Sequence, residues 1–305
     1  MRYLVTGAAG FIGSQLLRTL LWRGHDAIGW DAFTDYYDPA LKEENARDLP
    51  VTRVDLADDP IELEGLDGVF HLAGQPGVAS FGGVFPIYVR QNVLASHRLF
   101  EAAAEAGVRT VFASSSSIYG DAATYPTPEE AAPRPLSPYG ITKLSAEHLA
   151  SAYAREFGLD HVVVRYFTIY GPRQRPDMAF TKMVTCLAEA RPFELFGDGE
   201  QSRSFTFVED AVEATVLSME QGSAGDVFNV GGGEEASMLD AIDILESVSG
   251  RTLELLPGPR REGDQARTLA DTSRIRERTG WEPRTPFAQG LEAQWRWAAD
   301  RVAAA

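Results

Sequence analysis

Short apolar runs alternate with segments of helical period along the first two thirds of the chain. The runs predict strands over residues 3–6, 26–30, 68–72, 110–113 and 161–166. The segments between them carry Leu, Ala and Phe at helical spacing over 14–23, 92–106 and 141–157. Each of these three segments ends just before a glycine, as helices commonly do. Strands that alternate with helices predict an α/β fold with a doubly wound parallel sheet.

The pattern changes after about Gly171, where Pro172, Pro176 and Pro192 interrupt it. Helical spacing returns only over 178–190, 208–220 and 238–249. We therefore expect a doubly wound domain over residues 1–170 and a smaller mixed α/β domain over 171–305. The helical piece near 205–222 has the option of packing back on the first sheet.

Composition and charge narrow the class of protein. The 305 residues are 44% hydrophobic, enough for a large core, and 28 Lys and Arg stand against 44 Asp and Glu, a formal charge of −16. This charge repels phosphates, so neither nucleic acid nor an anionic membrane is expected as a partner. The single cysteine, Cys186, excludes an intrachain disulfide and a multi-thiolate metal site, and no metal is expected. With no apolar run near the roughly 20 residues that span a bilayer, we expect a cytoplasmic protein.

A glycine-rich turn follows the first expected strand and opens a helix, with the sequence TGAAGFIG over residues 6–13. Gly7, Gly10 and Gly13 permit a tight turn, and free amides at the helix start can face a pyrophosphate. Asp31 follows the second strand, where a carboxylate accepts hydrogen bonds from both adenosine ribose hydroxyls and repels a 2′-phosphate. The pattern indicates NAD rather than NADP; the alternative is a turn that only packs the helix on the sheet.

Two further strand ends are candidates for cofactor contacts. Asp55 and Leu56 follow a third expected strand, where they can meet the adenine edge. Ala73, Gly74 and Gln75 follow the fourth, where small residues let the backbone pass under the cofactor. Taken alone, each is also compatible with an ordinary strand-end loop.

Tyr139 and Lys143 lie four residues apart at an expected helix start, on one face of that helix. An unperturbed tyrosine titrates at about 10, and both a nearby ammonium and a positive nicotinamide ring favour the phenolate. The pair therefore predicts a general base. A surface tyrosine beside a helix lysine is the alternative.

The glycine motif, the Tyr139/Lys143 pair and the run SSSSIYG over 114–120 together resemble the extended short-chain dehydrogenase/reductase family, whose sugar-nucleotide members are epimerases and dehydratases. The resemblance covers essentially the whole chain and implies NAD on the first domain and a nucleotide sugar on the second. It implies Ser115 as the third catalytic residue, which shares a proton with Tyr139, and Ser116 and Ser117 as sugar contacts. The cofactor contacts that it implies are Gly7, Gly10, Phe11, Ile12, Gly13, Asp31, Asp55, Leu56, Ala73, Gly74, Gln75, Asn92, Tyr139, Lys143 and Tyr166.

The residues after Ser115 favour an epimerase over a dehydratase. Dehydratases of this family usually carry an Asp-Glu pair there, whereas this chain has Ser116 and Ser117. Without an acid for elimination, the reaction needs only oxidation at C4, turnover of the 4-keto sugar and reduction on its other face.

Two segments narrow the substrate. Residues 31–42 and 165–179 are similar to stretches of UDP-glucuronate 4-epimerases, in which the positions matching Thr168 and Arg175 meet the substrate carboxylate. A 4-keto hexuronate is a β-keto acid, so charge-assisted bonds from Arg175 can hold its carboxylate away from the geometry that releases CO2. The alternative is that Arg175 is a solvated loop charge or a phosphate contact.

For the nucleotide, Arg203 and Arg261 match positions that pair with the pyrophosphate, and Phe196 matches one beside the uracil. Surface charge and a core aromatic are the alternatives. The chain has Ser204 after Arg203 where the family usually has Asp, and Glu209 where Asp is commoner. The substrate contacts that the resemblance implies are Ser115, Ser116, Ser117, Thr168, Arg175, Ala179, Phe196, Arg203, Arg261 and Asp264.

We therefore expect an NAD-dependent 4-epimerase that converts UDP-glucuronate to UDP-galacturonate. The alternatives are an epimerase of UDP-glucose or UDP-N-acetylglucosamine, a UDP-sugar decarboxylase or dehydratase, and a non-catalytic dinucleotide sensor. The resemblance also implies a homodimer, paired through helices such as 92–106 and 141–157.

Overall fold

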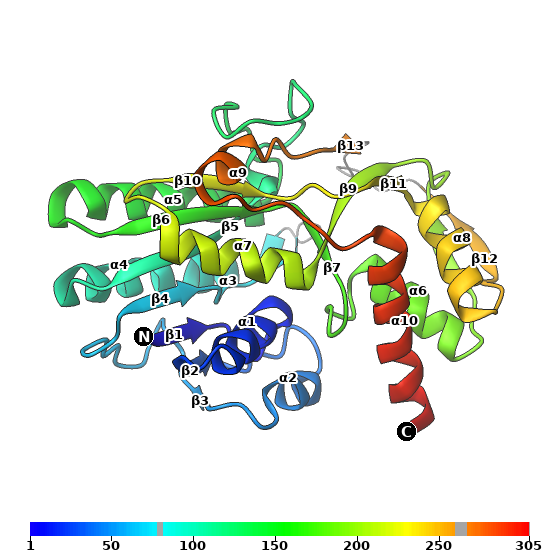
Figure 1. Ribbon diagram of the computed structural model, residues 1–305, viewed down its shortest axis with the longest axis horizontal. Coiled ribbons are helices and arrows are strands. Elements are labelled where there is room, and N and C mark those ends of the chain that lie inside the picture. The colour runs from blue at the N-terminus through cyan, green and yellow to red at the C-terminus, as the bar shows by residue number, and fades with distance from the viewer. Residues whose placement is uncertain (78–81, 260–266, 305) are drawn as a thin grey trace.

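The computed structural model describes residues 1–77, 82–259 and 267–304 and has two lobes side by side (Figure 1). The first lobe contains a seven-stranded sheet in the order β10-β6-β5-β4-β1-β2-β3, and every neighbouring pair is parallel. This arrangement confirms the doubly wound α/β fold. The strands are β1 (Arg2–Thr6), β2 (Asp26–Asp31), β3 (Val51–Arg53), β4 (Gly68–His71), β5 (Arg109–Ser115), β6 (His161–Tyr166) and β10 (Val227–Val230).

Helices cover both faces of this sheet. One face packs against α4 (Ala95–Ala106) and α5 (Pro138–Phe157), and the other against α1 (Phe11–Trp22) and α7 (Val208–Gln221) (Figure 1). Because side chains alternate along a strand, neighbouring residues enter opposite cores. In β4, for example, Val69 belongs to the core under α4 and α5, and Phe70 belongs to the core under α1 and α7. A sheet covered on both sides explains why its strands read as continuous apolar runs.

Two helices begin earlier than the sequence indicates. The segment expected from residue 92 continues α3 (Phe85–Tyr88) and the π-helical turn η2 (Val89–Leu94). The helix expected from 141 is α5, and it begins at Pro138, where the Ser137 hydroxyl accepts a hydrogen bond from the Gly140 amide at 3.1 Å. Tyr139 therefore lies in the first turn of α5.

The second lobe is built from short strands and three long helices. Its strands form one four-stranded and one two-stranded sheet: β7 (Thr168–Tyr170), β9 (Ser202–Phe207), β11 (Glu235–Ser237) and β13 (Arg267–Thr268), and β8 (Phe193–Phe196) with β12 (Leu255–Gly258). The expected helices over 178–190 and 238–249 are present as α6 (Ala179–Ala188) and α8 (Met238–Ser249). Three more helices were not expected from the sequence: α10 (Phe287–Ala304) in this lobe, and α2 (Pro39–Ala46) and α9 (Ser273–Thr279), which pack on the first lobe.

The chain crosses between the lobes more than once. After β9 it returns to the first lobe as α7, which packs on α1, and later as β10, which pairs with β6 at the sheet edge. The option left open for 205–222 is thus realised, and a strand beyond the expected boundary at 170 joins the first sheet as well. None of the described helices is long and apolar enough to cross a membrane.

Candidate active site

The glycine turn places the start of α1 against the carboxyl ends of β1 and β4. Gly7 has φ of +70°, and a Cβ there would lie 2.8 Å from the Ala73 nitrogen. A Cβ at Gly13 would lie 2.1 Å from the Gly7 carbonyl oxygen. Side chains are therefore excluded at both positions. The start of α1 has neither a side-chain cap nor an acidic residue in its first turn, an arrangement that fits a pyrophosphate.

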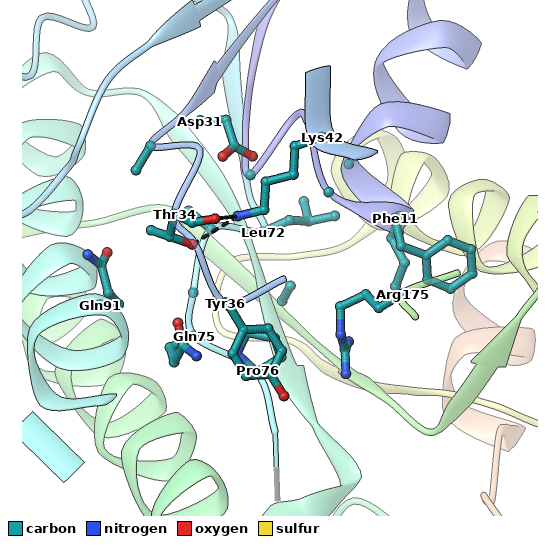
Figure 2. Close-up of a pocket in the computed structure, with 18 of the residues that line it drawn as sticks. Phe11, Asp31, Thr34, Tyr36, Lys42, Leu72, Gln75, Pro76, Gln91 and Arg175 are labelled. Carbon is teal, nitrogen blue, oxygen red and sulfur yellow. Dashed lines mark hydrogen bonds between the residues drawn. The ribbon is translucent and has the colours of Figure 1, made fainter. Parts of the chain in front are cut away.

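Asp31 is fixed beside this turn at the end of β2. Its carboxylate oxygens accept hydrogen bonds from the backbone amides of Ala9 (3.0 Å) and Phe33 (2.7 Å). The side chain is buried and lines the same cavity as the glycine turn (Figure 2). A carboxylate oxygen has more than one lone pair, so both oxygens can still accept bonds from ribose hydroxyls.

One cavity brings together most of the expected cofactor residues (Figure 2). The residues proposed from the sequence that line it are Gly7, Gly10, Phe11, Ile12, Gly13, Asp31, Ala73, Gly74, Gln75, Tyr139, Lys143, Tyr166 and Arg175. Those that the structure describes but that do not line it are Asp55, Leu56, Asn92, Ser115, Ser116, Ser117, Thr168, Ala179, Phe196 and Arg203. Arg261 and Asp264 lie outside the described residues.

Two residues expected to contact the cofactor make other contacts in the structure. The Asp55 carboxylate pairs with Arg90 at 2.9 Å. The fully buried Asn92 accepts a bond from the Gln75 amide (2.7 Å) and donates to the Gln75 carbonyl (3.0 Å) and the Thr142 hydroxyl (3.0 Å). Asn92 thus holds one wall of the cavity against α5, and its direct contact with the cofactor stays a prediction.

The cavity contains a buried cation, Lys42, that was not expected from the sequence. Lys42 donates to the carbonyl and hydroxyl oxygens of Thr34 at 2.8 and 2.9 Å, and its ammonium lies 5.0 Å from the centre of the Tyr37 ring. Burial lowers the pKa of Lys42. Figure 2 shows Lys42 beside Asp31. An available signal was the helix start at Asp38-Pro39, which places a lysine in the first turn near the end of β2.

Lys143 is fixed behind the reacting position. Its buried ammonium donates to the Ala113 carbonyl at 2.8 Å and lies 4.9 Å from the centre of the Phe112 ring. Burial lowers the pKa of Lys143 to about 8, although the nearby Glu147 carboxylate acts against this. A Cβ on Gly74 would lie 3.2 Å from this ammonium, so the lysine needs a glycine beside it.

The groups that act on the pKa of Tyr139 in the structure differ from the Lys143 ammonium expected from the sequence. Burial raises the pKa of its phenol, while a hydrogen bond with Ser115 and the charge of Arg175 act to lower it. Arg175 thus favours the phenolate, and Lys143 is bonded to the Ala113 carbonyl.

The serine run separates into two roles. Ser115 bonds with Tyr139, and its hydroxyl donates to the Ser117 hydroxyl at 3.1 Å. The Ser114 hydroxyl instead donates to Glu147, which pairs with Arg165 through two bonds of 3.0 and 2.7 Å. Ser115 is therefore hydrogen-bonded to Tyr139, and its catalytic role stays a prediction.

The second lobe contributes Arg175 to the cavity. Arg175 follows β7, and its guanidinium makes two bonds of 3.0 Å to the Asp177 carboxylate. The other proposed substrate residues lie on second-lobe elements: Thr168 begins β7, Ala179 begins α6, Phe196 ends β8 and Arg203 lies in β9.

Comparison with known proteins gives the family. Residues 3–231 match the model of the NAD dependent epimerase/dehydratase family. The chain belongs to this family. Its cofactor is NAD, and the cavity described above fits it: a glycine turn for the pyrophosphate and a fixed carboxylate for the ribose.

Members of the epimerase/dehydratase family resemble this chain over nearly its full length. It is 41% identical over 303 residues (95% of this chain, 96% of the relative) to a Bacillus subtilis protein named "uncharacterized UDP-glucose epimerase YtcB". It is 34% identical over 314 residues (98% and 97%) to a UDP-glucuronate 4-epimerase of Thermodesulfobacterium geofontis. The crystal structure of a Bacillus cereus UDP-glucuronic acid 4-epimerase in complex with UDP-glucuronic acid and NAD is 37% identical, with a TM-score of 0.94 over 99% of this chain and 100% of that one.

Proposed function

We propose that this protein catalyses the NAD-dependent 4-epimerisation of a UDP-sugar, and that it converts UDP-glucuronate to UDP-galacturonate. The observation that carries the choice of substrate is the position of Arg175, a cation in the same cavity as Tyr139 and Lys143. A carboxylate on the sugar gives this cation a partner in a chain that otherwise carries a large negative charge.

The chain's own groups supply the proton transfers. When NAD is bound, its positive nicotinamide ring acts with Arg175 to favour the phenolate of Tyr139 against the effect of burial. The phenolate accepts the proton of the C4 hydroxyl, and Ser115 turns its single O–H from Ser117 to the same sugar oxygen. When bound, NAD takes up the C4 hydrogen with its electron pair and later returns it, so the cofactor is unchanged after each turnover. The flat 4-keto sugar turns between these two events, and Tyr139 then returns the proton to the C4 oxygen. The sugar leaves with C4 inverted and no net oxidation.

A uronate substrate adds a constraint, because its 4-keto form is a β-keto acid. If the C5–C6 bond aligns with the carbonyl π system, that bond breaks, its electron pair forms an enolate at C4, C5 takes up a proton and CO2 leaves. An epimerase has to keep the carboxylate out of this alignment. We propose that Arg175, with the Thr168 hydroxyl, does so through charge-assisted hydrogen bonds.

The alternative is an epimerase of a neutral sugar such as UDP-glucose. The name of the Bacillus subtilis relative favours this alternative, as does the bidentate bond between Arg175 and Asp177, which shows that the guanidinium already has one carboxylate partner.

Product analysis separates these functions. The purified protein is incubated with UDP-glucuronate, UDP-glucose or UDP-N-acetylglucosamine, and the products are identified by NMR. We expect UDP-galacturonate from the first substrate. A UDP-pentose would indicate a decarboxylase, whereas turnover of the neutral sugars alone would assign the alternative. Arg175→Ala is expected to impair the uronate reaction selectively and to increase the loss of CO2; equal activity on UDP-glucuronate would remove the role given to Arg175.

We further propose that the protein acts as a homodimer. Apolar side chains are exposed together along α3, η2 and the start of α5, among them Phe85 (43%), Ile87 (47%) and Ile141 (47%), and a second copy of the chain can cover them. Sedimentation of a Phe85→Glu/Ile87→Glu variant tests this, with Trp22→Glu on α1 as the matched control. We expect only the double variant to be monomeric.

We propose the cytoplasm as the compartment. The chain has a single cysteine and so forms no intrachain disulfide, which fits a reducing compartment. Cys186 is buried in α6 as a free thiol. Fractionation of cells that express the full chain, with the protein detected by an antibody, tests this assignment.

A further inference from the structure

Among the described residues, only one edge of the Arg175 guanidinium forms hydrogen bonds. Its Nε and one terminal nitrogen donate to the two carboxylate oxygens of Asp177, each at 3.0 Å. A guanidinium has five N–H groups, so three remain, and two of them form the edge between the terminal nitrogens. Within the described ranges no hydrogen bond engages the second terminal nitrogen. Arg175 lines the cavity (Figure 2), whereas Asp177 does not, and the edge that Asp177 leaves open is available to a ligand in the cavity.

Asp177 is itself held by a residue of the first lobe. The Tyr36 hydroxyl donates to the second carboxylate oxygen of Asp177 at 3.3 Å. Tyr36 follows Asp31 on the segment between β2 and α2, and its ring projects into the cavity near Gln75 and Pro76 (Figure 2). Burial and the Asp177 charge raise the pKa of Tyr36 to about 12, so the hydroxyl remains a donor at neutral pH.

We propose that Asp177 and Tyr36 form a clamp that fixes the plane of the Arg175 guanidinium and directs its open edge at the C6 carboxylate of the sugar. Asp177 and Tyr36 are positioning residues in this scheme, since each acts through Arg175. The inference rests on the proposed function, because it requires a uronate substrate. It assigns the orientation of the carboxylate to two residues that lie 141 positions apart in the sequence.

The geometry gives the clamp a chemical consequence. A lone arginine at the end of a flexible side chain can bind a carboxylate at many angles, whereas a guanidinium locked on one edge presents its other edge in a single plane. A bidentate partner in that plane has its C5–C6 bond fixed relative to the C4 carbonyl. The clamp therefore controls the partition of the 4-keto intermediate between reduction, which gives the epimer, and cleavage of the C5–C6 bond, which gives CO2.

In the opposite role, Asp177 would compete with the substrate carboxylate for Arg175. If Asp177 merely occupied Arg175, removing its charge would free the cation and improve the binding of UDP-glucuronate. The two roles predict opposite signs for the same substitution, so one variant decides between them.

The experiment compares Asp177→Asn and Tyr36→Phe with Glu189→Gln. Glu189 is bonded to Arg191 at 2.6 Å with the same two-residue spacing, in an exposed pair that does not line the cavity, so it is the matched control. Steady-state rates with UDP-glucuronate, the fraction of UDP-pentose by NMR, and the binding of UDP, which has no sugar carboxylate, are measured for each protein.

For Asp177→Asn we expect kcat/KM for UDP-glucuronate to fall about 10- to 100-fold, by analogy with the loss when the partners that orient metal-binding side chains are removed. The UDP-pentose fraction is expected to rise, and the affinity for UDP to stay within about threefold of wild type. Tyr36→Phe is expected to change both quantities in the same direction by less. A merely structural role would not move the product ratio.

Rates and product ratios equal to those of Glu189→Gln would overturn the clamp, as would a rise in kcat/KM in Asp177→Asn. These results leave the proposed function intact as long as the wild-type protein epimerises UDP-glucuronate. If the wild-type protein does not act on UDP-glucuronate, the proposed substrate is wrong, and the proposed role of Asp177 and Tyr36 is wrong as well.

Discussion

The buried pair of Glu147 and Arg165 behind the reacting serines gives the sharpest test of the energetics. Both side chains are 8% exposed, and two bonds of 3.0 and 2.7 Å join them. Arg165 also donates to the Tyr119 hydroxyl (2.8 Å) and to the Glu129 carbonyl (2.9 Å). Glu147→Gln keeps the shape of the side chain and leaves the Arg165 charge buried without its counter-charge.

Removing one partner of a buried ion pair costs about 3–5 kcal/mol. We expect Glu147→Gln and Arg165→Met each to lower the free energy of unfolding by this amount. The double variant leaves no uncompensated charge at positions 147 and 165 and is therefore expected to lose at least about 2 kcal/mol less than the sum of the single losses. The buried Lys143 ammonium loses the nearby Glu147 charge in both Glu147→Gln and the double variant, so this cost does not enter the difference. Part of the cost remains in the double variant, because the Tyr119 hydroxyl and the Glu129 carbonyl lose their donor.

Urea unfolding followed by circular dichroism and by tryptophan fluorescence measures these energies, and the two signals must coincide for a two-state treatment. The reasoning is refuted if Glu147→Gln loses less than about 1 kcal/mol, or if the two single losses add within about 0.5 kcal/mol. Additive losses would mean that solvent screens the pair despite its burial.

Three further predictions concern the reacting tyrosine, the glycine turn and a buried histidine. Tyr139→Phe should retain NAD binding by fluorescence titration but lose about 10²- to 10⁴-fold in turnover, because the general base is gone; activity within tenfold of wild type would exclude that role. Gly13→Ala should weaken NAD binding and lower stability by about 1–3 kcal/mol, since its Cβ would meet the Gly7 oxygen at 2.1 Å, whereas Gly10→Ala, with 3.1 Å to the same atom, should cost less; equal losses in urea unfolding would contradict this. Burial and the nearby ammonium of Lys143 lower the pKa of His71 to about 3, so the unfolded chain takes up a proton near pH 6.5 that the folded chain refuses, and stability falls as the pH drops from 6.5 toward 3. Between pH 7 and 5 the wild type should lose about 2 kcal/mol more than His71→Gln in urea unfolding, and parallel pH profiles would show that His71 does not carry this dependence.

The first lobe was predictable because local signals and the fold agree. A strand, the glycine turn, a helix and Asp31 follow one another within 31 residues. All four features are typical of the same strand–turn–helix unit that binds a dinucleotide. The choice of Ser115 over Ser114 came from the resemblance, and the structure gives a physical reason for it: Glu147 takes the Ser114 hydroxyl.

Other features were hidden for identifiable reasons. The early start of the helix at Phe85 was missed because this segment exposes apolar side chains, so its hydrophobic pattern is not that of a helix packed on its own core. Strands β11 and β13 are too short to show a period. The bond between Tyr36 and Asp177 joins residues 141 positions apart, and no periodicity along the chain encodes which way two such side chains point.

The path of the chain between the lobes limits how this enzyme can be re-engineered. Within the described residues, the backbone passes from one lobe to the other between Tyr166 and Thr168, between Phe207 and Val208, and between Val230 and Glu235. It crosses twice more on either side of α9, which packs on α7 and β10. A chimera that grafts the sugar-binding lobe of a relative onto this scaffold therefore needs a splice point at each of these crossings. A fragment truncated after the first crossing would leave β6 as a bare sheet edge and α1 without its neighbour α7, two surfaces prone to aggregation.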